Sequence, residues 1–314
     1  MFTKRDDLFH PAPAGEWAWT ETNWFSFQIP EENIDGEVYI YFRPNLGVTY
    51  AGIFVWDSFC KHFTDAYYFD IRHHLPMPKG DLDDYTLENG MRIKVLEPLR
   101  KYQVDYDPGT DTYLHMTFEA VTDAIDYNEN RELGSEGKFI ANHMEQPGRV
   151  RGELCVRGRK HRIDCISHRD HSWARRLEGH DSIPNLGWHV GHFDERNWFH
   201  CMLWDDGDVQ DRIANAYVIT DGVRKSVVTA RRESKWDETG IEPREIHLEL
   251  TDTDGVVHVF DGTVKNLFPW PSWYNLLTQA GLVEWRSAGR RGWGEVQDVR
   301  QVDWAIRKKR ASRR

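Results

Sequence analysis

The chain has 314 residues, and its 40 basic and 51 acidic side chains give a formal net charge of −11. This length suffices for one large domain or two of ordinary size. The acidic balance disfavours a nucleic-acid partner. No apolar run approaches the length of a membrane span, so we expect no stable membrane insertion.

The beginning of the sequence and its cysteines indicate a cytoplasmic protein. Residues Met1–Asp7 lack the apolar stretch of a secretion signal. The four cysteines show no metal-type spacing, which favours reduced thiols. The last eight residues, Arg307–Arg314, carry six basic side chains, and we expect them to form a disordered, solvated tail.

Short strand-like runs separated by turn signals recur along the chain and predict an all-β protein. In chain order, the expected strands are Glu37–Phe42, Ala51–Val55, Arg92–Glu97, Thr112–Val121, Arg149–Val156, His161–Ile166, Trp198–Trp204, Ile213–Thr220, Ser226–Ala230, Glu245–Leu250, Val256–Phe260 and Glu295–Trp304. Asp206, Asp221 and Asp254 are each followed by glycine, and Asp-Gly pairs predict tight hairpin turns.

Within the strand at Thr112–Val121, apolar residues alternate with polar ones, as in the wall of a barrel or sandwich. The best helix candidate is Trp273–Ala280, with Ser272 as its N-cap and Gly281 just past its end. Two runs of strands flank the region around residue 170. We therefore expect an N-terminal β domain of residues 1–167 and a C-terminal β domain of residues 168–306, followed by the tail of residues 307–314.

Aromatic side chains are abundant, since 14 Trp, 12 Tyr and 15 Phe make up 13% of the chain. Most are expected to fill the inner faces of thin sheets. A pocket for a flat or polyunsaturated ligand would use the same rings.

The segment His168–Arg176 holds six charged or titratable side chains, a hydroxyl and one Trp within nine residues. This density suits a lined pocket at the junction of the two strand runs. The alternative is a solvated loop that is anchored by Trp173, with surface pairing between Asp170 and arginine.

Neither a metal nor another cofactor is expected. Of the 15 histidines, the pairs His168/His171 and His189/His192 are three residues apart, which on a strand directs their side chains to opposite faces. The glycines of Gly289–Gly294 open no helix, so this segment is read as a hairpin or barrel corner. No Gly-x-Ser-x-Gly elbow is present. Acid–base chemistry without a cofactor is the remaining option.

Two motifs resemble a known family. Asn142–Leu154, followed after a hairpin by Arg169-Asp170-His171-Ser172-Trp173, resembles bacterial proteins related to hydroxyneurosporene synthase, the carotenoid 1,2-hydratase. Further similarity to an uncharacterised branch of this group covers most of the chain, although only Asp170–Trp173 is shared with the carotenoid enzymes. The resemblance implies two lipocalin-like antiparallel β-barrels, or half-barrels, in tandem. The carotenoid enzymes protonate an isolated double bond, and water then captures the cation.

The resemblance also implies site residues. It places His171 and Trp173 in the pocket with Asp170 beside them, and His168 in the same segment. A Trp face can stabilise a carbocation, and a group removed from water can have its pKa moved toward the working pH. On an extended segment, His171 and Trp173 share one face and Asp170 faces away. His171 is then expected to touch substrate, and Asp170 to orient it or to pair with Arg169 or Arg175.

The family's proton donor lies on the next strand, in an aromatic-x-Asp arrangement from which this chain departs. It offers Trp198-Phe199-His200 or Trp204-Asp205 at that place. Trp198 and His200 share a face, and so do Met202 and Trp204. His200 can therefore serve as the donor, whereas Asp205, beside Asp206-Gly207, fits a plain hairpin turn better than a donor.

His143 and Glu145 alternate onto one face of their strand. They either line the pocket beside Asp170 or form a cross-strand polar pair with Arg149 or Arg151.

We therefore expect a cofactor-independent acid–base enzyme of the hydratase, lyase or isomerase type, with a pocket at the barrel junction. Its substrate would be a hydrophobic terpenoid, steroid or polycyclic aromatic compound. A non-catalytic carrier of the same small molecules is the alternative, and a surface interaction protein is a third option. The sequence leaves a homodimer open.

Overall fold

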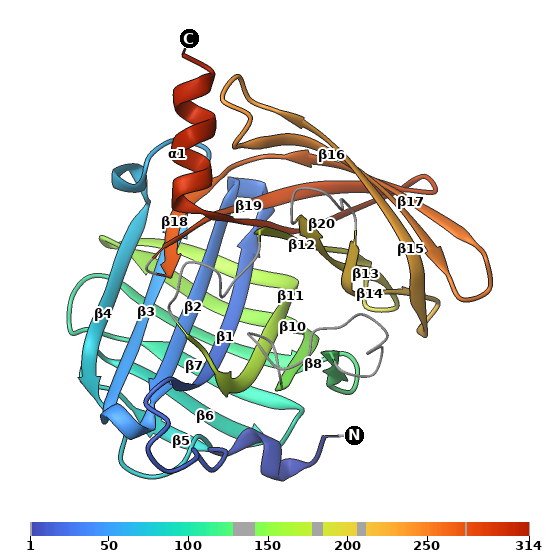
Figure 1. The fold of residues 1–314 in the computed structure, drawn as a ribbon. Coiled ribbons are helices and arrows are strands. Elements are labelled where there is room, and N and C mark those ends of the chain that lie inside the picture. The colour runs from blue at the N-terminus through green and yellow to red at the C-terminus, as the bar shows by residue number, and fades with distance from the viewer. Residues whose placement is uncertain (1, 128–141, 178–184, 206–211, 274, 314) are drawn as a thin grey trace. The chain divides into compact units, whose positions relative to one another are not determined.

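The computed structural model describes residues 2–127, 142–177, 185–205, 212–273 and 275–313. Strands make up 66% of it and helices 8%, which confirms the all-β expectation. Contacts divide the chain into two compact units. Unit 1 comprises Met1–Val55 and Tyr67–Leu177, and unit 2 comprises Trp56–Ala66 and Glu178–Arg314. Each unit is built around one antiparallel sheet (Figure 1).

Unit 1 is a half-barrel whose strands follow the order β4-β3-β2-β1-β11-β10-β8-β7-β6-β5, with β9 paired to β10. Its strands are β1 (Trp19–Ile29), β2 (Ile34–Arg43), β3 (Val48–Trp56), β4 (Tyr68–Pro76), β5 (Asp84–Thr86), β6 (Met91–Glu97), β7 (Lys101–Tyr106), β8 (Tyr113–Ala120), β9 (Ile125–Asp126), β10 (Asn142–Val156) and β11 (Arg159–Arg175). The short 3-10 helices are η1 (Lys4–Asp7), η2 (Pro30–Glu32) and η3 (Pro44–Leu46).

Period-two alternation gives this sheet an inner face that forms the core. Phe25 and Phe27 of β1 belong to the core cluster together with Met116 and Phe118 of β8, as the alternation in β8 predicted. The inner face is therefore set by sequence parity, and a polar residue in phase with Phe25 lies on the same side as the core.

The N-terminal segment, residues 2–18, is fastened to this inner face. The buried Asp7 carboxylate accepts a hydrogen bond from the Tyr102 hydroxyl of β7 at 2.7 Å and lies 3.4 Å from the Arg169 guanidinium of β11. Phe9 packs edge-on against Phe42 of β2, with ring centroids 5.1 Å apart. These contacts place the start of the chain beside three strands of the sheet, β2, β7 and β11.

Unit 2 contains a closed barrel of eight strands. The order β17-β16-β15-β14-β13-β12-β20-β19-β18 is closed by pairing of β17 with β19. Its elements are η4 (Phe63–Asp65), β12 (Asn185–Asp194), β13 (Asn197–Asp205), β14 (Arg212–Thr220), β15 (Val223–Trp236), β16 (Pro243–Asp252), β17 (Val257–Val264), β18 (Phe268–Trp273), β19 (Leu276–Ser287), β20 (Arg290–Gln301) and α1 (Val302–Ala311). The segment Trp56–Ala66 belongs to it, since the Trp56 indole donates to Asn266 Oδ1 at 2.9 Å.

Two expectations about helices are wrong. Of the residues expected as a helix, Trp273 ends β18 and residues 276–280 begin β19, while Tyr274 lies outside the described residues. Pairing of β19 with its neighbouring strands overrides the local helix signals. The expected disordered tail begins inside α1, a helix that continues to Ala311. Its basic last turn complements the helix dipole, and an ion pair at 3.2 Å joins Asp303 to Arg307.

Turn chemistry is observed where expected. Asp221 and Gly222 have φ angles of 52° and 82°. In the pair Asp254-Gly255, the glycine has a φ angle of 79°. Gly289, with a φ of 78°, lies in the turn between β19 and β20, whereas the rest of the glycine-rich segment, residues 290–294, belongs to strand β20. The pair at Asp206 lies outside the described residues. The expected boundary after residue 167 falls within β11, and contacts divide the units only after Leu177.

Candidate functional site

The expected motif at residues 168–173 forms the central part of β11, between β1 and β10. In register, Asn23 of β1 is opposite His171, and Glu145 of β10 is opposite Asp170. Since side chains alternate across a strand, Arg169, His171 and Trp173 share the inner face with Phe25, whereas His168, Asp170 and Ser172 lie on the other face. The segment is thus a central strand, and the solvated-loop alternative is wrong.

On the face opposite the core, three titratable side chains form what we call the acid–base cluster: His143, Glu145 and Asp170. Ligand-type atoms of the three lie within 4.8 Å of one another. His143 Nε2 is 3.2 Å from Glu145 Oε1, which also accepts a hydrogen bond from the Tyr127 hydroxyl at 3.3 Å. Thr22 of β1 donates to Asp170 Oδ1 at 3.5 Å. Three neighbouring strands therefore contribute to this cluster.

Burial moves two pKa values in this cluster in opposite directions. It raises the pKa of Asp170 above its ordinary range, although the nearby His143 and Arg176 oppose the change. Burial lowers the pKa of His143 to about 4. The imidazole is thus neutral near pH 7 and able to accept a proton, beside a carboxyl group that holds its proton more readily than usual.

The expected arginine partners of these residues are engaged elsewhere. Arg149 and Arg151 both pair with Asp164, while His143 and Glu145 lie beside Asp170. Arg169 donates to Gln146 Oε1 at 2.9 Å, and Arg175 pairs with Glu16 at 2.7 Å. The expected ion pair of Asp170 with Arg169 or Arg175 is therefore wrong.

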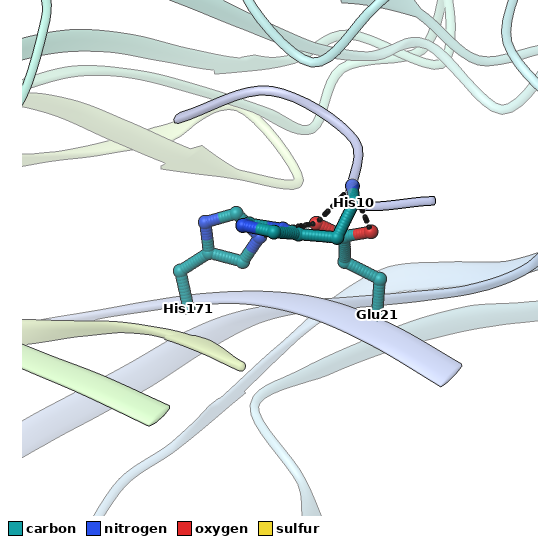
Figure 2. Close-up of side chains that lie close together, drawn as sticks. All are labelled: His10, Glu21 and His171. Carbon is teal, nitrogen blue, oxygen red and sulfur yellow. Dashed lines mark hydrogen bonds and ion pairs between the residues drawn. The ribbon is translucent and has the colours of Figure 1, made fainter. Parts of the chain in front are cut away.

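On the inner face lies a second group, which we call the inner cluster: His10, Glu21 and His171 (Figure 2). Glu21 Oε1 is 2.8 Å from His10 Nδ1 and 2.9 Å from His171 Nε2. Burial alone would raise the pKa of Glu21, but hydrogen bonds from the two histidines lower it. The Trp173 ring stacks on His10, with centroids 3.5 Å apart and planes within 6°.

The remaining expected site residues, Trp198, His200 and Trp204, belong to β13 of unit 2. They lie on one face, opposite the core residues Phe199, Cys201 and Leu203. The His200 ring stacks on Tyr217, with centroids 5.1 Å apart.

Trp204 and Asp205 line a pocket of about 190 Å³ together with Arg232 and Arg300. Asp205 accepts a hydrogen bond from Arg300 at 2.8 Å, so it is an ion-pair partner as well as the last residue of its strand.

Sequence analysis missed His10, Glu21 and Tyr127. One signal was available for Glu21, because it is in phase with Asn23 and Phe25 on a strand whose odd-numbered residues face the core. His10 and Tyr127 carry no such signal, since only the fold brings them to the two clusters.

Comparison with known structures supports the fold. Kievitone hydratase from Nectria haematococca aligns at a TM-score of 0.56 with 14% identity, over 90% of this chain and 88% of that one. CghA aligns at a TM-score of 0.60 with 12% identity, over 91% of this chain and 88% of that one. A putative AttH from Nitrosomonas europaea aligns at 0.59 with 12% identity, over 90% and 92%. The expected fold, two lipocalin-like β-barrels or half-barrels in tandem, is thereby confirmed.

Among curated proteins, none matches this sequence. No helix in the described part of the chain has both the length and the apolar character of a membrane span. A family model described as "Domain of unknown function (DUF7064)" matches residues 3–303. Because this match spans nearly the whole sequence, the chain belongs to that family.

Proposed function

We propose that the protein is a cofactor-independent acid–base enzyme of the hydratase, lyase or isomerase type. The observation that carries this proposal is the convergence of His143, Glu145 and Asp170 within 4.8 Å. The shared fold with kievitone hydratase supports it by analogy. A hydrophobic terpenoid, steroid or polycyclic aromatic compound is the proposed substrate class, because cationic intermediates of such compounds suit aromatic surroundings.

In the hydration direction, the Asp170 carboxyl group donates its proton to one carbon of a double bond, which leaves a cation on the other carbon. A water molecule attacks that carbon, and His143 accepts the proton that the water releases. Glu145 orients the His143 ring through their 3.2 Å contact. Dehydration is the same sequence in reverse. In isomerisation, the cation instead loses a proton from a different neighbouring carbon to His143, and no water is added.

Because His171 lies on the inner face, we no longer propose that it touches the substrate. His171 and Asp170 lie on opposite faces of β11, so His171 does not face the acid–base cluster to which Asp170 belongs. We therefore assign the role of proton donor to Asp170. His168 shares the Asp170 face of β11 and stays a proposed substrate-side residue of unit 1, whereas Trp173 lies with His171 on the opposite face. Trp198 and Trp204 stay proposed aromatic substrate-binding residues of unit 2, and His200 stays the alternative proton donor.

The test is turnover of a panel of unsaturated terpenoids, steroids and polycyclic aromatics and their hydrates, followed by mass spectrometry in H₂¹⁸O. Asp170→Asn, which keeps the shape of the side chain, should lower kcat by about 10²–10⁴-fold. Asp164→Asn is the matched control, because Asp164 is a carboxylate of the same strand that pairs with Arg149 at the surface.

Equal loss of activity in both variants, or full activity in Asp170→Asn, would remove the acid–base cluster from the reaction. If the wild type binds members of the panel but converts none of them, the protein is a carrier and the enzyme proposal fails.

A further inference from the structure

Among the residues that the structure describes, no Lys or Arg side chain pairs with Glu21, a buried carboxylate on the inner face of unit 1. Glu21 is 0% exposed. Within the described residues, it accepts hydrogen bonds from the His10 backbone N–H and contacts the rings of His10 and His171. A buried negative charge is expensive unless it is paired or coordinates a cation.

Three atoms that can bind a metal lie together here: His10 Nδ1, His171 Nε2 and Glu21 Oε1 (Figure 2). Nδ1 of His10 and Nε2 of His171 approach the same oxygen, Glu21 Oε1, at 2.8 and 2.9 Å. In a tetrahedral zinc site with bonds of about 2.0 Å, ligand atoms lie about 3.3 Å apart. Each histidine nitrogen would therefore have to move away from Glu21 Oε1 by about 0.4–0.5 Å to admit an ion.

The surroundings of His10 fit a metal ligand. Its second nitrogen, Nε2, lies 3.4 Å from Asp6 Oδ1, so the ring has a carboxylate at each nitrogen. A neutral ring carries one proton and can donate to only one of them. With a cation at Nδ1, the proton resides on Nε2 and faces Asp6, which is the carboxylate–histidine–metal arrangement of many metal sites. Stacking on Trp173 holds the ring in that orientation.

We propose that His10, Glu21 and His171 bind a divalent transition-metal ion, with Zn²⁺ as the preferred ligand. Two imidazoles and one carboxylate suit zinc, and they leave a coordination position for water. The three ligands come from the N-terminal segment, β1 and β11. The ion fastens residues 2–18 to two adjacent strands. This site lies on the opposite face of β11 from Asp170 and is separate from the proposed acid–base reaction.

Histidine pairs that are close in sequence, such as His168 and His171, do not form this site by themselves, since their side chains lie on opposite faces of the strand. Glu21 and His171 are 150 residues apart and meet through the pairing of β1 with β11. No local pattern could show this convergence.

The experiment titrates the full-length protein with ZnCl₂ by calorimetry, after removal of bound metal with a chelator. One equivalent should bind to the wild type. Glu21→Gln, which keeps the size of the side chain but removes its charge, should abolish binding. His10→Gln should weaken it at least tenfold, and Asp6→Asn by about 10- to 100-fold through the second nitrogen. Added Zn²⁺ should raise the Tm of the wild type and slow its cleavage by trypsin at Lys4 and Arg5.

Two control variants separate this site from other histidine–carboxylate groups. His143→Gln removes a ligand atom of the acid–base cluster, and His115→Ala removes an exposed histidine that pairs with Asp105. Both should bind Zn²⁺ as the wild type does.

The proposal fails if the wild type binds no Zn²⁺ up to about 1 mM, or if binding survives Glu21→Gln and is lost in His143→Gln. If Glu21→Gln does not fold, His10→Gln decides, because His10 lies outside the sheet. A folded His10→Gln protein with unchanged affinity would overturn the site.

Discussion

Neighbouring residues of β11 lie in different polar clusters. Asp170 faces His143 and Glu145, whereas His171, one position later, faces Glu21 on the core side. Because side chains alternate along a strand, a shift of one residue moves a side chain from the acid–base cluster to the inner cluster. The chemistry of this strand therefore depends on parity, and substitutions at the two positions should have different effects.

Replacing His171 by Ala should destabilise the metal-free protein by about 1–3 kcal/mol, because the buried Glu21 carboxylate loses one of its hydrogen-bond donors. Urea unfolding of the variant measures the loss. His115→Ala, at a half-exposed side chain, serves as the control and should change stability by less than about 0.5 kcal/mol. Equal values for both variants would contradict the assignment of His171 to the Glu21 group.

Stability in acid should depend on His189, which is fully buried in unit 2 with Nδ1 3.1 Å from the Cys201 carbonyl oxygen. Burial lowers its pKa to about 3, and Arg232 adds to the effect. The folded-state pKa is thus below the unfolded value of about 6.5. The contribution to stability is intact above pH 6.5 and falls by about 1.4 kcal/mol per pH unit as the pH drops toward 3.

Urea unfolding at pH 7, 6, 5 and 4 tests this. The curve for His189→Gln should fall less steeply with decreasing pH than that of the wild type. Parallel curves would show that His189 does not bind a proton on unfolding.

Among the elements, glycines under aromatic rings explain several close approaches between strands. A Cβ built on Gly148 of β10 would lie 2.3 Å from the Phe118 ring of β8, and one on Gly36 would lie 2.4 Å from Phe27. Neither glycine has a positive φ, so space for the ring, and not backbone conformation, requires them. The core of the half-barrel thus depends on ring-over-glycine pairs between strands.

Gly148→Ala should destabilise the protein by about 1–3 kcal/mol, since the added methyl group overlaps the Phe118 ring. A double-mutant cycle provides the control: Phe118→Leu should cost less stability in the Gly148→Ala protein than in the wild type. Strictly additive losses would show that the methyl group does not meet this ring.

Local signals explain which elements were predictable. Asp221-Gly222 and the alternation in β8 are properties of a few adjacent residues, and the structure confirms both. The Trp273–Ala280 helix was wrong because pairing of β19 with β20 outweighs a local cap signal. For the candidate site, parity placed His143 and Glu145 together, whereas the meeting of Glu21 with His171 depends on strands that are distant in sequence.

At the scale of the whole molecule, the chain leaves unit 1 for one short segment. Trp56–Ala66 belongs to unit 2, and the completely buried Trp56 ring lies 5.6 Å from Phe268, centroid to centroid. Unit 2 is therefore not a continuous stretch of sequence. The expected C-terminal domain of residues 168–306 lacks Trp56–Ala66, which packs within this unit.

Trp56→Ala should destabilise the protein by about 3–5 kcal/mol, because it empties a large buried volume and removes the donor to Asn266. Phe59→Ala is the matched control within the same segment, since Phe59 is 74% exposed and should cost almost nothing. Calorimetric unfolding compares the two. Comparable losses would mean that the segment is held by its backbone alone.

The pairing of β1 with β11 has a consequence for synthesis on the ribosome. β1 finds β2 at once, but its other edge pairs with residues near His171, opposite Asn23. At about 5–20 residues per second, that partner emerges roughly 7–30 seconds later. Throughout this interval the nascent chain carries an open strand edge that can pair with other chains. The expression yield of this protein should therefore respond to chaperones and to growth temperature more than its compact final fold suggests.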